Sequence, residues 1–196
     1  MLTKTVIENI LILLGESFWV FSIYAQLRKL LKTRNKLGLS AVTQTLNAAG
    51  NVAWATYFAN RHLWLPFTTN IVMFFLTVVI LGYILTNRKQ FTKGLLTIAI
   101  VGPLTSYLII KLPHTSGWLG VAYNSLSTLP WFRHLVVTKK SSGISHHSLI
   151  FTYGAISCTL SYAILIISFP LITGCLLGFV YTTAIAGYYR NYRHNH

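Results

Sequence analysis

Polar side chains recur along one side of the apolar segment 40–60. Gln44, Asn47, Asn51 and Trp54 are spaced at i, i+3, i+7 and i+10, so a helix would project them from one face. Amides supply hydrogen-bond donors and acceptors, and an indole adds one donor and a flat apolar face. We expect Asn47, Asn51 and Trp54 to contact a small neutral polar solute, whereas Gln44 lies near a helix end. The alternative is that these groups only bind a neighbouring helix.

Asn70 is a second isolated amide, placed among Phe67, Ile71 and Phe74 in the apolar segment 64–86. Polar groups in apolar surroundings are costly unless they face a partner or a water-filled cavity. We expect Asn70 to contact the same solute, and the alternative is again a hydrogen bond between helices.

Glu16 lies near the middle of the first apolar segment, 5–27. A carboxylate at that depth costs about 2.5–3.5 kcal/mol. No Lys or Arg lies at that depth to pair with it, so the loss of water favours the neutral acid. Two interpretations stay open: Glu16 couples transport to protons or binds solute, or it is a protonated structural acid.

Residues that would indicate an enzyme are missing from the sequence. No Ser/His/Asp or Cys/His set has usable spacing, and no glycine loop could cradle a phosphate. The histidines are scattered or adjacent, which is a poor arrangement for a metal. Cys158 and Cys175 lie in apolar segments, which predicts reduced thiols. We therefore expect no catalytic residue, no metal and no cofactor.

The composition is that of a membrane protein. The chain is 54% hydrophobic and 9% charged, with a net charge of +14 and Glu8 and Glu16 as its two acids. Soluble domains carry about 25% charged residues. The cations gather in short clusters between apolar runs, which indicates control of membrane orientation rather than nucleic-acid binding. The expected surroundings are a lipid bilayer.

Seven apolar segments are long enough to cross a bilayer as helices. They occupy about 5–27, 40–60, 64–86, 94–112, 117–137, 145–168 and 170–189. Lys and Arg concentrate in alternate loops and in the C-terminal tail, which predicts an N-terminus outside and a C-terminus in the cytosol.

The chain also matches itself without a gap at an offset of 105 residues, for example at Ser22/Ser127, Tyr57/Tyr162, Thr77/Thr182, Ile80/Ile185 and Gly82/Gly187. The segment 94–112 has no counterpart and would reverse the chain between the copies. We predict an all-α membrane protein of two parallel three-helix bundles joined by a linker helix. The units are 1–90, 91–113 and 114–196.

The offset pairs unlike residues at the expected site. Thr159 corresponds to Trp54, Cys175 to Asn70 and Val121 to Glu16. We expect Thr159 and Cys175 to line the same cavity, so the two halves would suit an asymmetric solute. Pro130 corresponds to Ala25, and a proline inside a helix frees a carbonyl and permits a kink. Pro130 is therefore a candidate hinge.

The segment Ala25-Gln26-Leu27-Arg28…Thr33…Gly38-Leu39-Ser40 and its copy Pro130-Trp131…Thr138…Gly143-Ile144-Ser145 resemble the PQ-loop repeat, in the layout of the SWEET sugar facilitators. Each copy keeps half of the Pro-Gln pair, and the resemblance implies a gate at Gln26 and Pro130. In those transporters a tryptophan and an asparagine about sixteen positions apart contact sugar. Trp54 and Asn70 have that separation, so the resemblance implies a solute site there.

The function expected from the sequence is transport of a small neutral polar solute, sugar favoured, by alternating access between the two bundles. The alternatives are proton-coupled amino-acid or vitamin carriers of the PQ-loop type, and a transport-inactive sorting receptor on the same scaffold. A bacterial inner membrane is favoured over an organelle membrane. The expected partners are the solute and lipid, not nucleic acid, and a homo-oligomer is compatible with the sequence.

Overall fold

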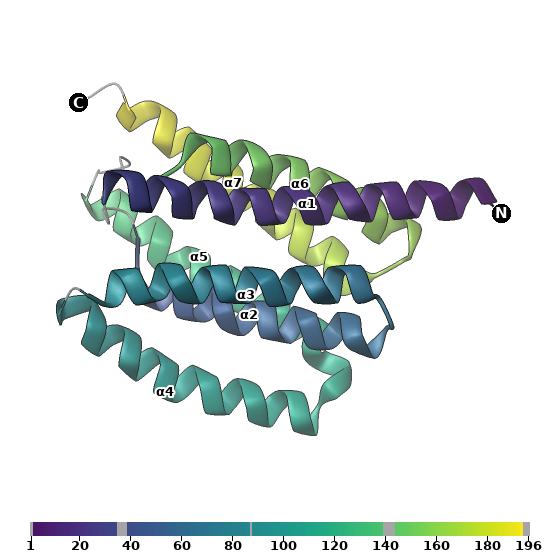
Figure 1. Ribbon diagram of the computed structural model, residues 1–196, viewed down its shortest axis with the longest axis horizontal. Helices are drawn as coiled ribbons and strands as arrows, with labels where there is room; N and C mark the ends of the chain where they lie inside the picture. Colours follow the sequence, from purple (N-terminus) through teal and green to yellow (C-terminus); the bar gives the residue numbers. More distant parts are fainter. Residues whose placement is uncertain (1, 35–38, 87, 139–143, 194–196) are drawn as a thin grey trace.

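Helices make up nearly all of the structure. The computed structural model describes residues 2–34, 39–86, 88–138 and 144–193. In this part of the chain, seven α-helices and one 3₁₀ turn follow one another along nearly antiparallel axes (Figure 1). They are α1 (Leu2–Thr33), α2 (Ala41–Asn60), α3 (Trp64–Leu85), α4 (Arg88–Lys111), η1 (Pro113–Thr115), α5 (Ser116–Thr138), α6 (His146–Leu165) and α7 (Phe169–Arg193).

Matching residues cap the matching helices α2 and α6. The Ser40 hydroxyl accepts a hydrogen bond from Thr43 N at 3.5 Å, and the Ser145 hydroxyl accepts one from Ser148 N at 3.3 Å. A serine at this position satisfies a backbone donor that the first helical turn leaves free. The caps fix where both helices begin.

The turns that end α2 and α6 also match. Leu63 N donates to Phe58 O, and Ser168 N donates to Ala163 O, both at 2.9 Å. His62 and Ile167 have φ of 57° and 53°, a left-handed conformation that is uncommon for residues other than glycine and rare for a β-branched residue such as Ile167. Each turn therefore reverses the chain within a few residues. As a result, α3 packs alongside α2, and α7 packs alongside α6.

Packing follows the same repetition. We call α1–α3 the first repeat and α5–α7 the second repeat. Within them, α3 packs against both α1 and α2, and α7 packs against both α5 and α6. Between the repeats, α1 packs against α6 and α2 against α5. Exchange of the repeats leaves this pattern unchanged, while α4 packs outside, against α2 and α3 (Figure 1).

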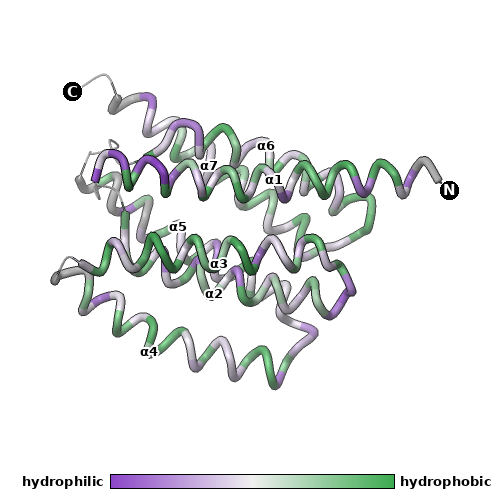
Figure 2. The backbone as a smooth tube through the Cα atoms, in the orientation of Figure 1, coloured by the Kyte–Doolittle hydropathy of each residue, from purple (hydrophilic) through white to green (hydrophobic). Residues whose placement is uncertain are grey.

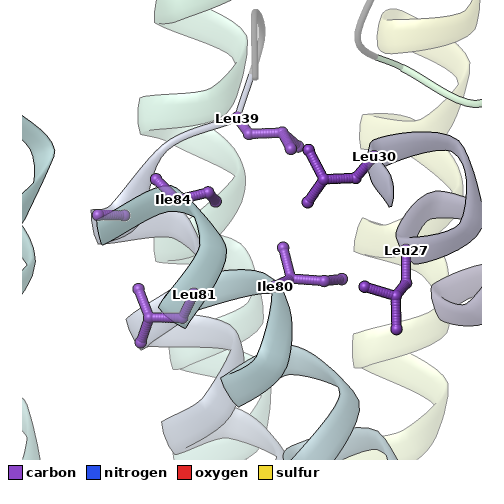
Figure 3. Close-up of a cluster of buried hydrophobic side chains, with 7 residues drawn as sticks. Leu27, Leu30, Leu39, Ile80, Leu81 and Ile84 are labelled. Carbon is purple, nitrogen blue, oxygen red and sulfur yellow. The ribbon is translucent and has the colours of Figure 1, made fainter. Parts of the chain in front are cut away.

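Each repeat has its own apolar cluster near the end of the molecule where α1 ends. In the first repeat, Leu27 and Leu30 of α1 face Ile80 and Ile84 of α3, with Leu39 above them (Figure 3). The second repeat packs Ile144, Leu149 and Ile185 together. Leu39 and Ile80 correspond to Ile144 and Ile185 at the offset of 105 residues, so the two clusters are copies of one packing solution.

The prediction of seven membrane-spanning helices is wrong. Among the described residues, five helices are long and apolar enough to cross a membrane: Lys4–Thr33, Trp64–Leu85, Phe91–Lys111, His146–Leu165 and Phe169–Arg190. Helices α2 and α5 are not among them, because amides and hydroxyls interrupt their apolar residues. The predicted orientation is derived from the cations in alternate loops between seven spans. It is therefore no longer supported.

The five apolar helices are those of a helical membrane protein. Large apolar side chains such as Phe75, Leu96 and Val180 are more than half exposed, which is the pattern expected where lipid replaces water. Hydrophilic residues gather instead in the last turns of α1, at the end of the molecule where α7 also ends (Figure 2).

Candidate functional site

A cavity of about 310 Å³ lies between the two repeats. Its wall is formed by α1, α2 and α3 on one side and by α5, α6 and α7 on the other. Eight of the nine residues selected from the sequence line it: Glu16, Gln26, Asn47, Asn51, Trp54, Asn70, Thr159 and Cys175. The structure therefore brings these side chains together around one space, and their roles in binding stay predictions.

The indole of Trp54 packs across the boundary between the repeats. A Cβ added at Gly120 of α5 would lie 2.7 Å from the ring, and one added at Gly174 of α7 would lie 3.4 Å away. Phe58, one turn later on α2, stacks on the same ring at a centroid distance of 5.9 Å. Trp54 is 7% exposed, so it faces protein and the cavity rather than lipid.

The amides of α2 and α3 point hydrogen-bonding groups into this space. Asn51 Nδ2 donates to Thr77 Oγ1 at 3.4 Å, and Asn70 Nδ2 donates to Pro66 O at 2.8 Å. This bond uses one of the two N–H groups of Asn70. The amide oxygen of Asn70 accepts no hydrogen bond from the described residues. Asn47 and Gln44 line the same wall, so acceptors and donors remain for a solute.

Glu16 is buried in the wall of the cavity, with 4% of its surface exposed. Its carboxyl interacts with the Thr69 hydroxyl of α3, and that hydroxyl already donates to Leu65 O at 3.0 Å. Thr69 can then only accept from Glu16, because a hydroxyl has one proton to donate. Glu16 Oε2 has no hydrogen-bond partner among the described residues.

Trp19, one turn after Glu16, escaped the sequence analysis. Its Nε1 donates to Thr159 Oγ1 at 3.2 Å, which joins α1 to α6 at the cavity wall. Beside it, a Cβ added at Gly15 would lie 2.9 Å from the same Thr159 oxygen. Thr159 is thus fixed by α1, whereas Cys175 presents a buried thiol from α7.

The internal repeat, at its offset of 105 residues, could have pointed to these close contacts between α1 and α6 and between α5 and α2. It pairs Gly15 with Gly120 and Thr159 with Trp54. The close approach of Gly15 to Thr159 and of Gly120 to Trp54 is therefore the same crossing in both halves. A glycine at matched positions marks a place where a neighbouring helix comes too near for a side chain.

The two ends of the cavity are closed differently. Where α2 ends, one apolar cluster joins both repeats, with Trp54 and Phe58 of the first packed on Val121 and Leu171 of the second. Nearby, the hydroxyls of Tyr57 and Ser168 share a hydrogen bond of 2.6 Å. Where α1 ends, the apolar clusters of the two repeats are separate.

Gln26 links the repeats at the end where those clusters are separate. Its Oε1 accepts from Ser145 N at 3.0 Å, and Lys29 Nζ donates to Ile144 O at 2.6 Å. These bonds tie the last turns of α1 to the start of α6. Pro130, the other expected gate residue, does not border the cavity, and α5 continues through it to Thr138. Its role as a hinge stays a prediction.

Neither a protein-family model nor a curated protein matches this chain in sequence. The PQ-loop and SWEET resemblance therefore stays a prediction.

Proposed function

We propose that this protein is a membrane carrier that moves a small polar solute through the cavity between its repeats. The observation that carries the proposal is the cavity itself. It lies between apolar helices and is lined by amides, hydroxyls and indoles. A merely structural interface would be expected to pack such groups against one another, because protein interiors leave few voids larger than a water molecule.

The size and lining of the cavity favour a solute of the size of a monosaccharide or smaller. Asn47, Asn51, Asn70 and Asn124 supply donors and acceptors, and Trp54 supplies an apolar face. Ligand sites combine apolar walls with a few placed polar groups in this way. Sugars are the favoured class, and the PQ-loop resemblance points in the same direction.

The difference between the two ends supports alternating access. A single apolar cluster holds the repeats together where α2 ends, and separate clusters occupy the other end. Rocking of one repeat against the other would open the first end and close the second. A solute drives this only by binding the two states differently.

Uptake into reconstituted vesicles tests the proposal. Labelled sugars, amino acids and nucleosides are offered to vesicles that contain the wild type, Asn70→Ala or Asn60→Ala. Asn60 is the matched control, because it bonds Pro113 O at the end of α2 and lies outside the cavity. We expect saturable uptake that Asn70→Ala weakens and Asn60→Ala does not. Binding without flux would indicate a receptor instead.

A further inference from the structure

The cavity has an uneven distribution of charge that its polar lining alone does not explain. The chain carries 16 Lys and Arg residues against two acids. Nevertheless, among the described residues that line the cavity, Glu16 is the only carboxylate, and none is Lys, Arg or His. An anionic solute would meet no countercharge there, whereas a cation would meet one once Glu16 gives up the proton with which it binds Thr69.

Glu16 also lacks a cationic partner among the described residues. The described groups that interact with it are Thr69 of α3, Tyr162 of α6 and Cys175 of α7. None of these is a cation. The cation Arg61 interacts instead with Tyr162 and lies over the Tyr57 ring at 5.2 Å. A buried carboxylate without a cation or a proton is strongly unfavourable.

Two polar side chains of α3, Thr69 and Asn70, donate to their own helix rather than to Glu16. Glu16 Oε2 has no partner, the Thr69 hydroxyl donates to Leu65 O, and Asn70 Nδ2 donates to Pro66 O. An ionised Glu16 therefore accepts no hydrogen bond from these two side chains and can accept one from a solute. An ammonium group brings three donors, one positive charge and no acceptor. Indoles such as those of Trp19 and Trp54, which line the same cavity, also attract cations.

We propose that the solute carries a single protonated amino group and that Glu16 binds it as the countercharge. This inference rests on the proposed carrier function and narrows its substrate class from polar solutes to polar amines, which sets neutral sugars aside as the favoured class. The remaining amides and hydroxyls bind the neutral part of the same molecule.

Three probes of nearly equal size test the inference: ethanolamine, which is positive, ethylene glycol, which is neutral, and glycolate, which is negative. Each is titrated into purified protein at constant ionic strength, and binding is followed by thermal unfolding. We expect ethanolamine alone to stabilise the wild type. Glu16→Gln should weaken its binding about 10- to 100-fold, because a hydrogen bond to a charged group is lost.

Glu8→Gln is the matched control, because Glu8 is the other acid and pairs with Lys4 at 3.7 Å, outside the cavity. It should bind ethanolamine as the wild type does. Glu16→Asp, which keeps the charge, should retain part of the binding and guards against a folding defect in Glu16→Gln. Equal responses to the three probes, no response to ethanolamine, or unchanged ethanolamine binding in Glu16→Gln would each overturn the inference.

Uptake by vesicles separates this inference from the carrier function. Flux of neutral solutes that is unaffected by Glu16→Gln would refute the amine site and leave the carrier intact. Ethanolamine binding at Glu16 without flux of any solute would refute the carrier and leave the amine site intact.

Discussion

Two alanine substitutions beside the same indole should differ in their effects on stability. At position 120 a Cβ would lie 2.7 Å from Cε2 and Nε1 of Trp54 and 2.8 Å from Cδ2, so the rigid ring or α5 must move. At position 174 the nearest ring atom would lie 3.4 Å away, which is ordinary contact. Gly120→Ala should therefore destabilise the protein, and Gly174→Ala should not.

The magnitudes follow from two opposing effects. Overpacking of a filled site costs about 1–3 kcal/mol, and replacing a helical glycine with alanine gains about 1 kcal/mol. Gly120→Ala should thus lose about 0–2 kcal/mol, and Gly174→Ala should gain up to about 1 kcal/mol. The separation of about 1–3 kcal/mol corresponds to roughly 2–12 °C in Tm for a chain of this length.

The Tm of both variants is measured by thermal unfolding in detergent. The signal is the reaction of Cys158 and Cys175 with a thiol-reactive dye as the protein unfolds. Gly82→Ala is the control, because a Cβ there meets nothing within 4 Å and reports helix propensity alone. Equal Tm values for the two variants, or a lower value for Gly174→Ala, would refute the packing of Trp54 on Gly120.

Two further predictions concern contacts across the repeats, and a third concerns proton coupling by Glu16. The free energy of unfolding should fall by about 0.5–1.5 kcal/mol in Trp19→Phe and in Thr159→Val. The double variant should lose little more than either, because all three remove the same hydrogen bond. Chemical unfolding measures these losses, and additive losses would contradict the prediction. Tyr57→Phe should lower stability by about 1 kcal/mol through the loss of its bond to Ser168, whereas Tyr107→Phe, at an exposed position of α4, serves as the comparison in the same assay. If Glu16 couples transport to protons, uptake by the wild type should respond to a pH gradient and uptake by Glu16→Gln should not; identical responses would exclude the coupling.

The sequence predicts the helices better than it predicts the membrane spans. All seven expected segments are helical, but α1 runs to Thr33 and α7 to Arg193, beyond the apolar runs. Lys and Arg favour helix as well as most apolar residues do, so a helix does not stop where hydropathy does. Conversely, α2 is a full helix whose amides keep it below the hydropathy of a membrane span.

The cavity could be predicted in part because a polar stripe on an apolar helix needs a partner. That argument found Asn47, Asn51 and Asn70, which line one space. It could not find Trp19 or Gly120, because an indole in an apolar run and a glycine in a helix carry no polar signal of their own. Their importance comes from the neighbouring helix, and only the repeat gives a hint of it.

Labelling of Cys175 with a charged, membrane-impermeant thiol reagent tests most directly whether the space between the repeats is a solute path. The experiment uses Cys158→Ala protein in vesicles, which leaves the thiol in the cavity wall as the only one in the chain. We predict that Cys175 reacts in the folded protein and that a transported solute slows the reaction. A thiol that stays unmodified until the protein is unfolded would contradict the account.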